Sequence, residues 1–115
     1  SVLLADGIAP GPLTEGVSKV LVVSGWPVSV ASPEGALLVS SGNDAWLAAA
    51  GDQQPAPPAD AVFGSHGVIG VSEIGRGRVV VSGDDAIFAN LAIGQADNAQ
   101  LLRNIIGLMT AATEI

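Results

Sequence analysis

The sequence predicts an α/β fold: a small, mostly parallel or mixed sheet with an amphipathic C-terminal helix at 97–112 packed on it. The apolar run Val79-Val80-Val81 lacks polar alternation, which indicates a central strand buried on both faces. A stripe of Leu and Ile at helical spacing follows near the C-terminus. Apolar residues make up 49% of the chain and charged residues 13%, so the sequence is too apolar for a disordered chain.

Length and charge limit the possible classes further. The 115 residues predict a single domain. The net charge of −7, with only four Lys and Arg residues, excludes a phosphate-driven nucleic-acid binder. The absence of cysteine excludes disulfides, thiolate metal sites and a cysteine nucleophile. No apolar run reaches the roughly 20 residues of a membrane span, so we expect no direct membrane insertion. Nothing visible resembles a signal peptide, and either a cytoplasmic or an exported location fits.

The N-terminal part is predicted to hold an irregular entry at 1–18 and two short apolar strands at 19–23 and 36–40. Glycine and proline punctuate the entry, which argues against regular structure there. The segment 43–50 is predicted to form one or two helical turns, with Asp44 as a possible cap.

The middle of the chain contains a low-complexity stretch and a clear hairpin signal. Residues 51–60 read GDQQPAPPAD and predict an extended, solvated loop, with a substrate-facing flap as the alternative. The runs 67–74 and 78–82 flank Gly75-Arg76-Gly77, which predicts a β-hairpin with a glycine-rich turn. The two arginines of the turn region are expected to pair with Glu73 or with acidic residues of a partner.

The C-terminal helix carries its own signals. Asp97 and Gln100 have the spacing of a capping box. The apolar stripe consists of Leu101, Leu102, Ile105, Ile106, Leu108, Met109 and Ala112. Gly107 lies inside the helix and costs about 1 kcal/mol relative to alanine, and a close approach to the sheet is one reason to have it there.

The segment 75–108 contains a series of spaced motifs. They are "G-x-G-r-V-x-V", "G-D/S-x-x-x-F/L-x-N" and "D/E-N-x-x-L-L-x-N-I", carried by Gly75, Gly77, Val79, Val81, Gly83, Asp84, Phe88, Asn90, Asp97, Asn98, Leu101, Leu102, Asn104 and Ile105. Upstream, 12–17 (PLTEGV) and 37–41 (LLVSS), followed by Trp46, add two shorter elements. In this order the chain resembles the class I glutamine-amidotransferase-like superfamily, specifically the non-catalytic branch of gliding-motility and intraflagellar-transport proteins.

The resemblance implies the C-terminal portion of a flavodoxin-like domain, so the chain looks like a fragment of a larger amidotransferase-like domain. Catalytic amidotransferases use a cysteine, and a histidine after a late strand. Here the late strand is followed by Gly83-Asp84-Asp85. We therefore expect a non-catalytic accessory or interaction domain of a larger bacterial protein. An exposed sheet edge would favour a protein partner or self-association.

The densest polar cluster consists of Asp84, Asp85, Asn90, Asp97 and Asn98. On the expected layout it begins at the carboxyl end of a central strand, where open α/β sheets bind ligands. Its oxygens are candidate ligands for Ca²⁺ or Mg²⁺. Paired carboxylates also suit acid–base chemistry in a hydrolase completed by missing segments or a second chain. Alternatively, these residues cap a turn and the last helix.

Three further residues are candidate surface contacts: Trp26, Trp46 and His66. An exposed tryptophan in a loop is a plausible sugar or protein contact, which makes a carbohydrate-binding module a further hypothesis. The alternatives are that each tryptophan covers an edge of the core and that the single histidine is an ordinary turn residue. The sequence does not identify a small-molecule ligand.

Overall fold

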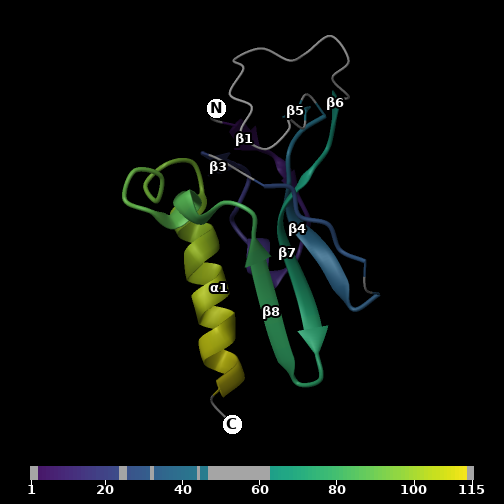
Figure 1. Cartoon of the computed structure of the whole chain (residues 1–115). Coiled ribbons are helices and arrows are strands. Elements are labelled where there is room, and N and C mark those ends of the chain that lie inside the picture. The colour runs from purple at the N-terminus through teal and green to yellow at the C-terminus, as the bar shows by residue number, and fades with distance from the viewer. Residues whose placement is uncertain (1–2, 24–25, 32, 44, 47–62, 114–115) are drawn as a thin grey trace.

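Antiparallel strand pairing organises this protein (Figure 1). The computed structural model describes residues 3–23, 26–31, 33–43, 45–46 and 63–113. The main sheet has the order β2-β4-β7-β8, formed by Gly7–Ile8, Gly35–Ser40, Gly67–Ile74 and Gly77–Ser82. Two smaller sheets pair β1 with β3 (Leu3–Ala5, Val20–Val22) and β5 with β6 (Ala45–Trp46, Phe63–Gly64). The helical elements are η1 (Pro12–Thr14), η2 (Asp85–Phe88) and α1 (Asn98–Thr113).

The predicted α/β fold with a mostly parallel or mixed sheet is wrong, because every strand pair in the described residues is antiparallel. Parallel neighbours need a long crossover, usually a helix between two strands. The α-helix of the described part, α1, comes after all the strands and so connects none of them. The flavodoxin-like arrangement that the family resemblance implied is therefore not the observed architecture.

The β-hairpin prediction is confirmed, but the position assigned to its second strand is wrong. β7 pairs with β8 from Ile74↔Gly77 to Ile69↔Ser82, and Gly75 in the turn has a φ of +60°, which favours glycine. β8 is the last strand of its sheet. Val79 and Val81 are 45% and 50% exposed, whereas Val80 packs toward the core. An uninterrupted valine run cannot distinguish an edge strand from a central one.

The strands predicted at 19–23 and 36–40 are confirmed as β3 and β4. The irregular entry predicted at 1–18 is wrong, because this segment contains β1, β2 and η1. These short elements depend on partners distant in sequence: β1 pairs with β3, and β2 pairs with β4.

The helical turns predicted at 43–50 are wrong where the structure describes them. Trp46 belongs to β5, and its ring packs edge to face with that of Phe63 at a centroid distance of 5.8 Å. This tertiary contact outweighs the local helical preference. Asp44, residues 47–50 and the Pro-rich loop 51–60 lie outside the described residues.

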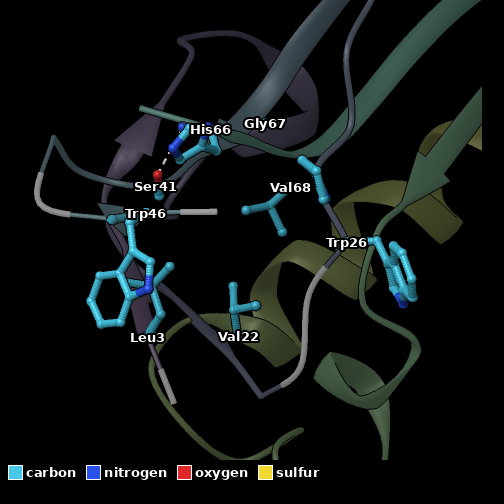
Figure 2. A pocket seen from close by; sticks show the side chains of 10 residues that line it. Leu3, Val22, Trp26, Ser41, Trp46, His66, Gly67 and Val68 are labelled. Carbon is cyan, nitrogen blue, oxygen red and sulfur yellow. Dashed lines mark hydrogen bonds between the residues drawn. The ribbon is translucent and has the colours of Figure 1, made fainter. Parts of the chain in front are cut away.

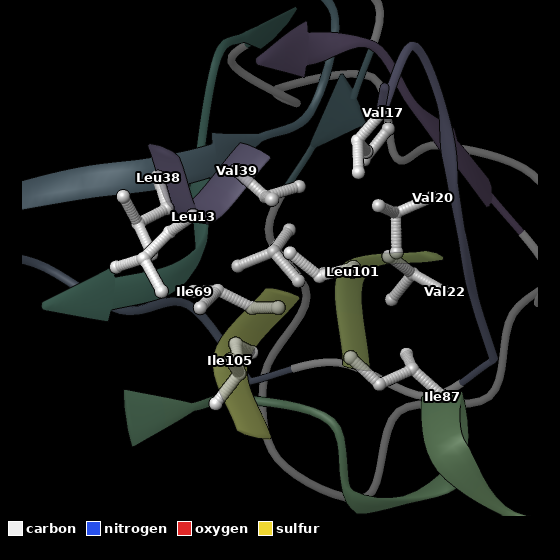
Figure 3. Close-up of a cluster of buried hydrophobic side chains, with 12 residues drawn as sticks. Leu13, Val17, Val20, Val22, Leu38, Val39, Ile69, Ile87, Leu101 and Ile105 are labelled. Carbon is white, nitrogen blue, oxygen red and sulfur yellow. The ribbon is translucent and has the colours of Figure 1, made fainter. Parts of the chain in front are cut away.

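The core lies where α1 and η2 meet the sheets (Figure 3). The C-terminal helix is confirmed, and its buried stripe residues are Leu101 and Ile105. They join a cluster that includes Leu13, Val17, Val20, Val22, Leu38, Val39, Val68, Ile69 and Ile87. Met109 and Ala112 lie beyond the side chains that the structure describes. Gly107 is exposed and a Cβ there would meet no atom within 4 Å, so the expected close approach is wrong. In the described residues, no helix has the length and hydropathy to cross a bilayer.

Candidate functional site

Asp97 binds the backbone just before β3. Its Oδ2 accepts hydrogen bonds from the N–H groups of Ser18 (2.8 Å) and Lys19 (3.1 Å). Its own N–H donates to the carbonyl of Lys19 (3.0 Å). The predicted capping box is not formed, since the Asp97 N–H donates to Lys19 and not to Gln100. The side-chain oxygen of Gln100 accepts from Arg103 instead (3.3 Å). The carboxylate of Asp97 thus ties the start of α1 to the entry of β3.

Asn98 continues the same pattern along β3. The side chain is fully buried, and its Oδ1 accepts from the N–H of Leu21 (2.8 Å). Its Nδ2 donates to the carbonyls of Leu21 (3.1 Å) and Ile87 (2.9 Å). One amide therefore joins β3, η2 and α1.

Asp84 also binds the backbone of this segment, at Val23 directly after β3. This buried carboxylate accepts from the N–H of Val23 (2.7 Å) and from that of Ala86 (2.9 Å), which caps η2. β1 pairs with only one edge of β3. Along the opposite edge lie the backbone N–H groups of Lys19, Leu21 and Val23, because alternate residues of a strand face the same edge. The side chains of Asp97, Asn98 and Asp84, in that order, accept hydrogen bonds from these groups. The three side chains thus supply the hydrogen-bond partners that a neighbouring strand would otherwise provide.

For Asp84 this arrangement agrees with the capping alternative, since Asp84 caps η2, whereas the Asp97 carboxylate binds the backbone before β3 and not the start of α1. Asp85 and Asn90 are exposed, away from the buried contacts of Asp84 and Asn98. Among the described residues, no group of three or more acidic or histidine side chains is placed to hold a metal ion. The backbone N–H donors already at Asp84 and Asp97 compete with a cation for the same oxygens. The Ca²⁺ or Mg²⁺ site stays a prediction without a geometric basis.

The hydrogen bonds to Asp97 predict a specific acid sensitivity. The N–H groups of Ser18 and then Lys19 hold the pKa of this carboxyl below its usual 3.8. Ionised Asp97 therefore stabilises the fold above about pH 4, and this contribution is lost as the pH falls through its lowered pKa. We expect Asp97→Asn to lower the urea midpoint at pH 7, with a difference from wild type that shrinks below about pH 4. An equal difference at both ends of a pH series would contradict a role for the charge.

The structure brings Trp26, Trp46 and His66 together around one pocket of about 140 Å³ (Figure 2). They come from the loop after β3, from β5 and from the segment before β7. The remaining lining residues are Leu3, Val22, Pro27, Ser41, Ala45, Gly67 and Val68. None of the lining side chains is a carboxylate, a lysine or an arginine, and the lining mixes polar and apolar surface.

His66 is held firmly at this pocket. Its carbonyl accepts from the N–H of Ser41, and its N–H donates to Ser41 Oγ, both at 2.8 Å. The hydroxyl of Ser65 donates to the carbonyl of Ser41 (2.9 Å). The Nε2 atom of His66 is buried and has no hydrogen-bond partner. Such an atom is uncommon in folded proteins, and the sequence prediction of an ordinary turn residue did not anticipate it.

Trp26 reaches the pocket on a segment that crosses the main sheet over glycines. Its N–H donates to the carbonyl of Gly83 (2.8 Å), and the N–H of Val28 donates to that of Gly67 (2.9 Å). A Cβ at Gly83 or Gly67 would collide with the carbonyl oxygen of Trp26 or Val28. The indole of Trp26 is 68% exposed. Gly67 of β7 and Gly83, directly after β8, are the sequence features that permit this close crossing.

No protein-family model, curated protein or solved structure matches this chain. The resemblance to the amidotransferase-like superfamily therefore stays a prediction from motifs.

Proposed function

We propose that this chain is a non-catalytic interaction domain of a larger bacterial protein and that it self-associates through the outer edge of β8. The observation that carries the proposal is an edge strand with half-exposed valines, Val79 and Val81. Long apolar edges of this kind are templates for pairing with another strand. The polar cluster supports a non-catalytic role, because the oxygens of Asp84 and Asp97 bind backbone groups.

The register of the β7–β8 hairpin indicates which backbone groups of β8 point away from β7, toward a further strand. The N–H of Gly83 donates to the carbonyl of Val68 (2.8 Å). In an antiparallel ladder the bonded pairs alternate, so Val81 and Val79 also face β7 with their backbone groups. The N–H and C=O groups of Arg78, Val80 and Ser82 then point outward from the sheet.

A second copy of the chain suits this edge. If two β8 strands pair antiparallel with Val80 opposite Val80, each Val79 lies opposite Val81 of the other copy, and Arg78 lies opposite Ser82. The centre of such a strand pair is complementary in apolar surface.

The test compares two strand residues of matched exposure. We expect the wild type to form dimers in a concentration-dependent manner in sedimentation equilibrium. Val81→Lys should raise the dimer dissociation constant about tenfold or more, because each dimer loses two valine pairs. Leu4→Lys, at a position 52% exposed on β1, should leave the constant unchanged. A wild type that stays monomeric at every concentration would overturn the proposal, as would equal weakening by Leu4→Lys.

A further inference from the structure

A dimer joined through β8 needs a larger contact than the two strands supply. Pairing along 78–82 joins five residues of each copy, whereas a stable interface takes about 20–30 residues a side. Val79 and Val81 add apolar surface on only one face of the joined sheet. A stable dimer therefore requires a second layer of contacts, from an element that lies over the other face near the β8 edge.

The helix α1 covers that other face. Val80 points to the face opposite Val79 and Val81, and it packs against the buried cluster to which Leu101 and Ile105 of α1 belong. Figure 1 shows α1 running along β8 in the opposite direction. A second copy that pairs with β8 thus approaches α1 as well.

One flank of α1 is apolar and faces the β8 side. Successive residues of an α-helix turn by about 100°, so Leu102 and Ile106 lie on the flank opposite Asn104. The Asn104 amide donates to the carbonyls of Leu13 and Glu15 at η1, and η1 follows β2, the strand at the far end of the sheet from β8. Ile106 is 55% exposed and Leu102 is half-buried. Apolar surface on this flank is therefore open toward β8.

The charges of β8 and α1 allow a second copy to approach. The chain as a whole carries a net charge of −7, which opposes self-association in general. Neither β8 nor α1 contains an acidic residue, and their charged side chains are Arg78 and Arg103. These two elements therefore do not repel a second copy through carboxylates.

We propose that α1 forms the second layer of the dimer, with Leu102 and Ile106 packed against the same residues of the other copy. This layer depends on the self-association through β8 proposed above. A two-fold axis through the Val80 pair is perpendicular to the joined sheet, so both α1 helices lie on the same side of the sheet. The helices run antiparallel across the axis, each with its apolar flank toward the other, and their dipoles attract in this orientation.

The experiment adds one lysine at each of two neighbouring positions of α1. Ile106→Lys places a charge inside the expected contact and should raise the dimer dissociation constant in sedimentation equilibrium about tenfold or more. Gly107→Lys is the matched control, because it adds the same charge about 100° further round the helix. Gly107 is exposed and a Cβ there meets nothing within 4 Å, so this variant should leave the constant unchanged.

Cross-linking gives a second measurement, because the chain has no cysteine. Ile106→Cys introduces a single thiol near the two-fold axis, and a short bismaleimide should link two copies through it. Gly107→Cys should be linked much less. Adding Val81→Lys to Ile106→Cys should abolish the link, since the helix contact depends on the pairing of β8.

Different results refute the two proposals. If Val81→Lys weakens the dimer and Ile106→Lys does not, or if Ile106→Lys and Gly107→Lys weaken it equally, the helix layer is refuted and the pairing of β8 stands. If Ile106→Lys weakens the dimer and Val81→Lys does not, the pairing of β8 is refuted and the layered dimer with it. A wild type that stays monomeric refutes both. Circular dichroism and thermal unfolding of each variant show that it is folded.

Discussion

Asn98→Ala is expected to lower the free energy of unfolding by about 3–5 kcal/mol, a large share of the stability of a small domain. The side chain makes three hydrogen bonds, to Leu21 N–H, Leu21 C=O and Ile87 C=O, in a fully buried place. Its removal leaves three backbone groups without a partner where water does not reach. Urea unfolding followed by circular dichroism measures the loss.

Asn104→Ala is the matched control for this prediction. Asn104 lies on the same helix, and its amide also donates to two backbone carbonyls, those of Leu13 (3.1 Å) and Glu15 (2.8 Å). It is only half-buried, so water can replace the lost bonds and we expect a loss of about 1 kcal/mol. Asn98→Asp should be nearly as damaging as Asn98→Ala, because an ionised carboxylate cannot donate to either carbonyl. Equal losses in Asn98→Ala and Asn104→Ala would contradict the account of Asn98.

Gly83→Ala is expected to lower the free energy of unfolding by about 2–4 kcal/mol and to displace Trp26 from the sheet. A methyl group at this position collides with the carbonyl oxygen of Trp26 and lies 3.1 Å from a methyl carbon of Val28. Relief of the collision requires the hydrogen bond from Trp26 N–H to Gly83 C=O to lengthen or break. Hydrogen exchange should show the amides of Trp26 and Val28 losing protection before those of the β7–β8 ladder.

Gly107→Ala provides a control of opposite sign. Gly107 is exposed inside α1, and a Cβ there meets nothing within 4 Å. The added methyl group should raise the free energy of unfolding by about 0.5–1 kcal/mol through the helical preference of alanine. A stabilising Gly83→Ala, or one that leaves the Trp26 amide protected, would show that the segment does not cross the sheet as described.

Local signals predicted the elements whose causes are local. The hairpin of β7 and β8 follows from two apolar runs around a glycine turn, and α1 follows from the 3.6-residue repeat of Leu101 and Ile105. The turn that Asp84 caps was also predictable, since an aspartate before a short helical segment is a common cap. These features need no partner from elsewhere in the chain.

The candidate site was predicted only as a set of residues. The sequence singled out Trp26, Trp46 and His66, but nothing in their spacing places them around one pocket. It also grouped Asp84, Asp97 and Asn98 as a ligand or metal cluster, whereas the structure uses them to bind the edge of β3. The residue types suit both roles, because the oxygens that bind a cation also accept from backbone N–H groups.

The amino-acid order by itself determined the hairpin, the closing helix and the two short strands β3 and β4, because hydrophobic period and turn chemistry act over a few residues. Which strands lie side by side, and in which direction, was decided only by the tertiary structure. The same valines of β8 suit a central parallel strand or an antiparallel edge, and the choice depends on which distant segments cover them. Burial is a property of the assembled chain, so the exposed edge of β8 and the unpartnered nitrogen of His66 emerge only when the sheets and α1 have packed.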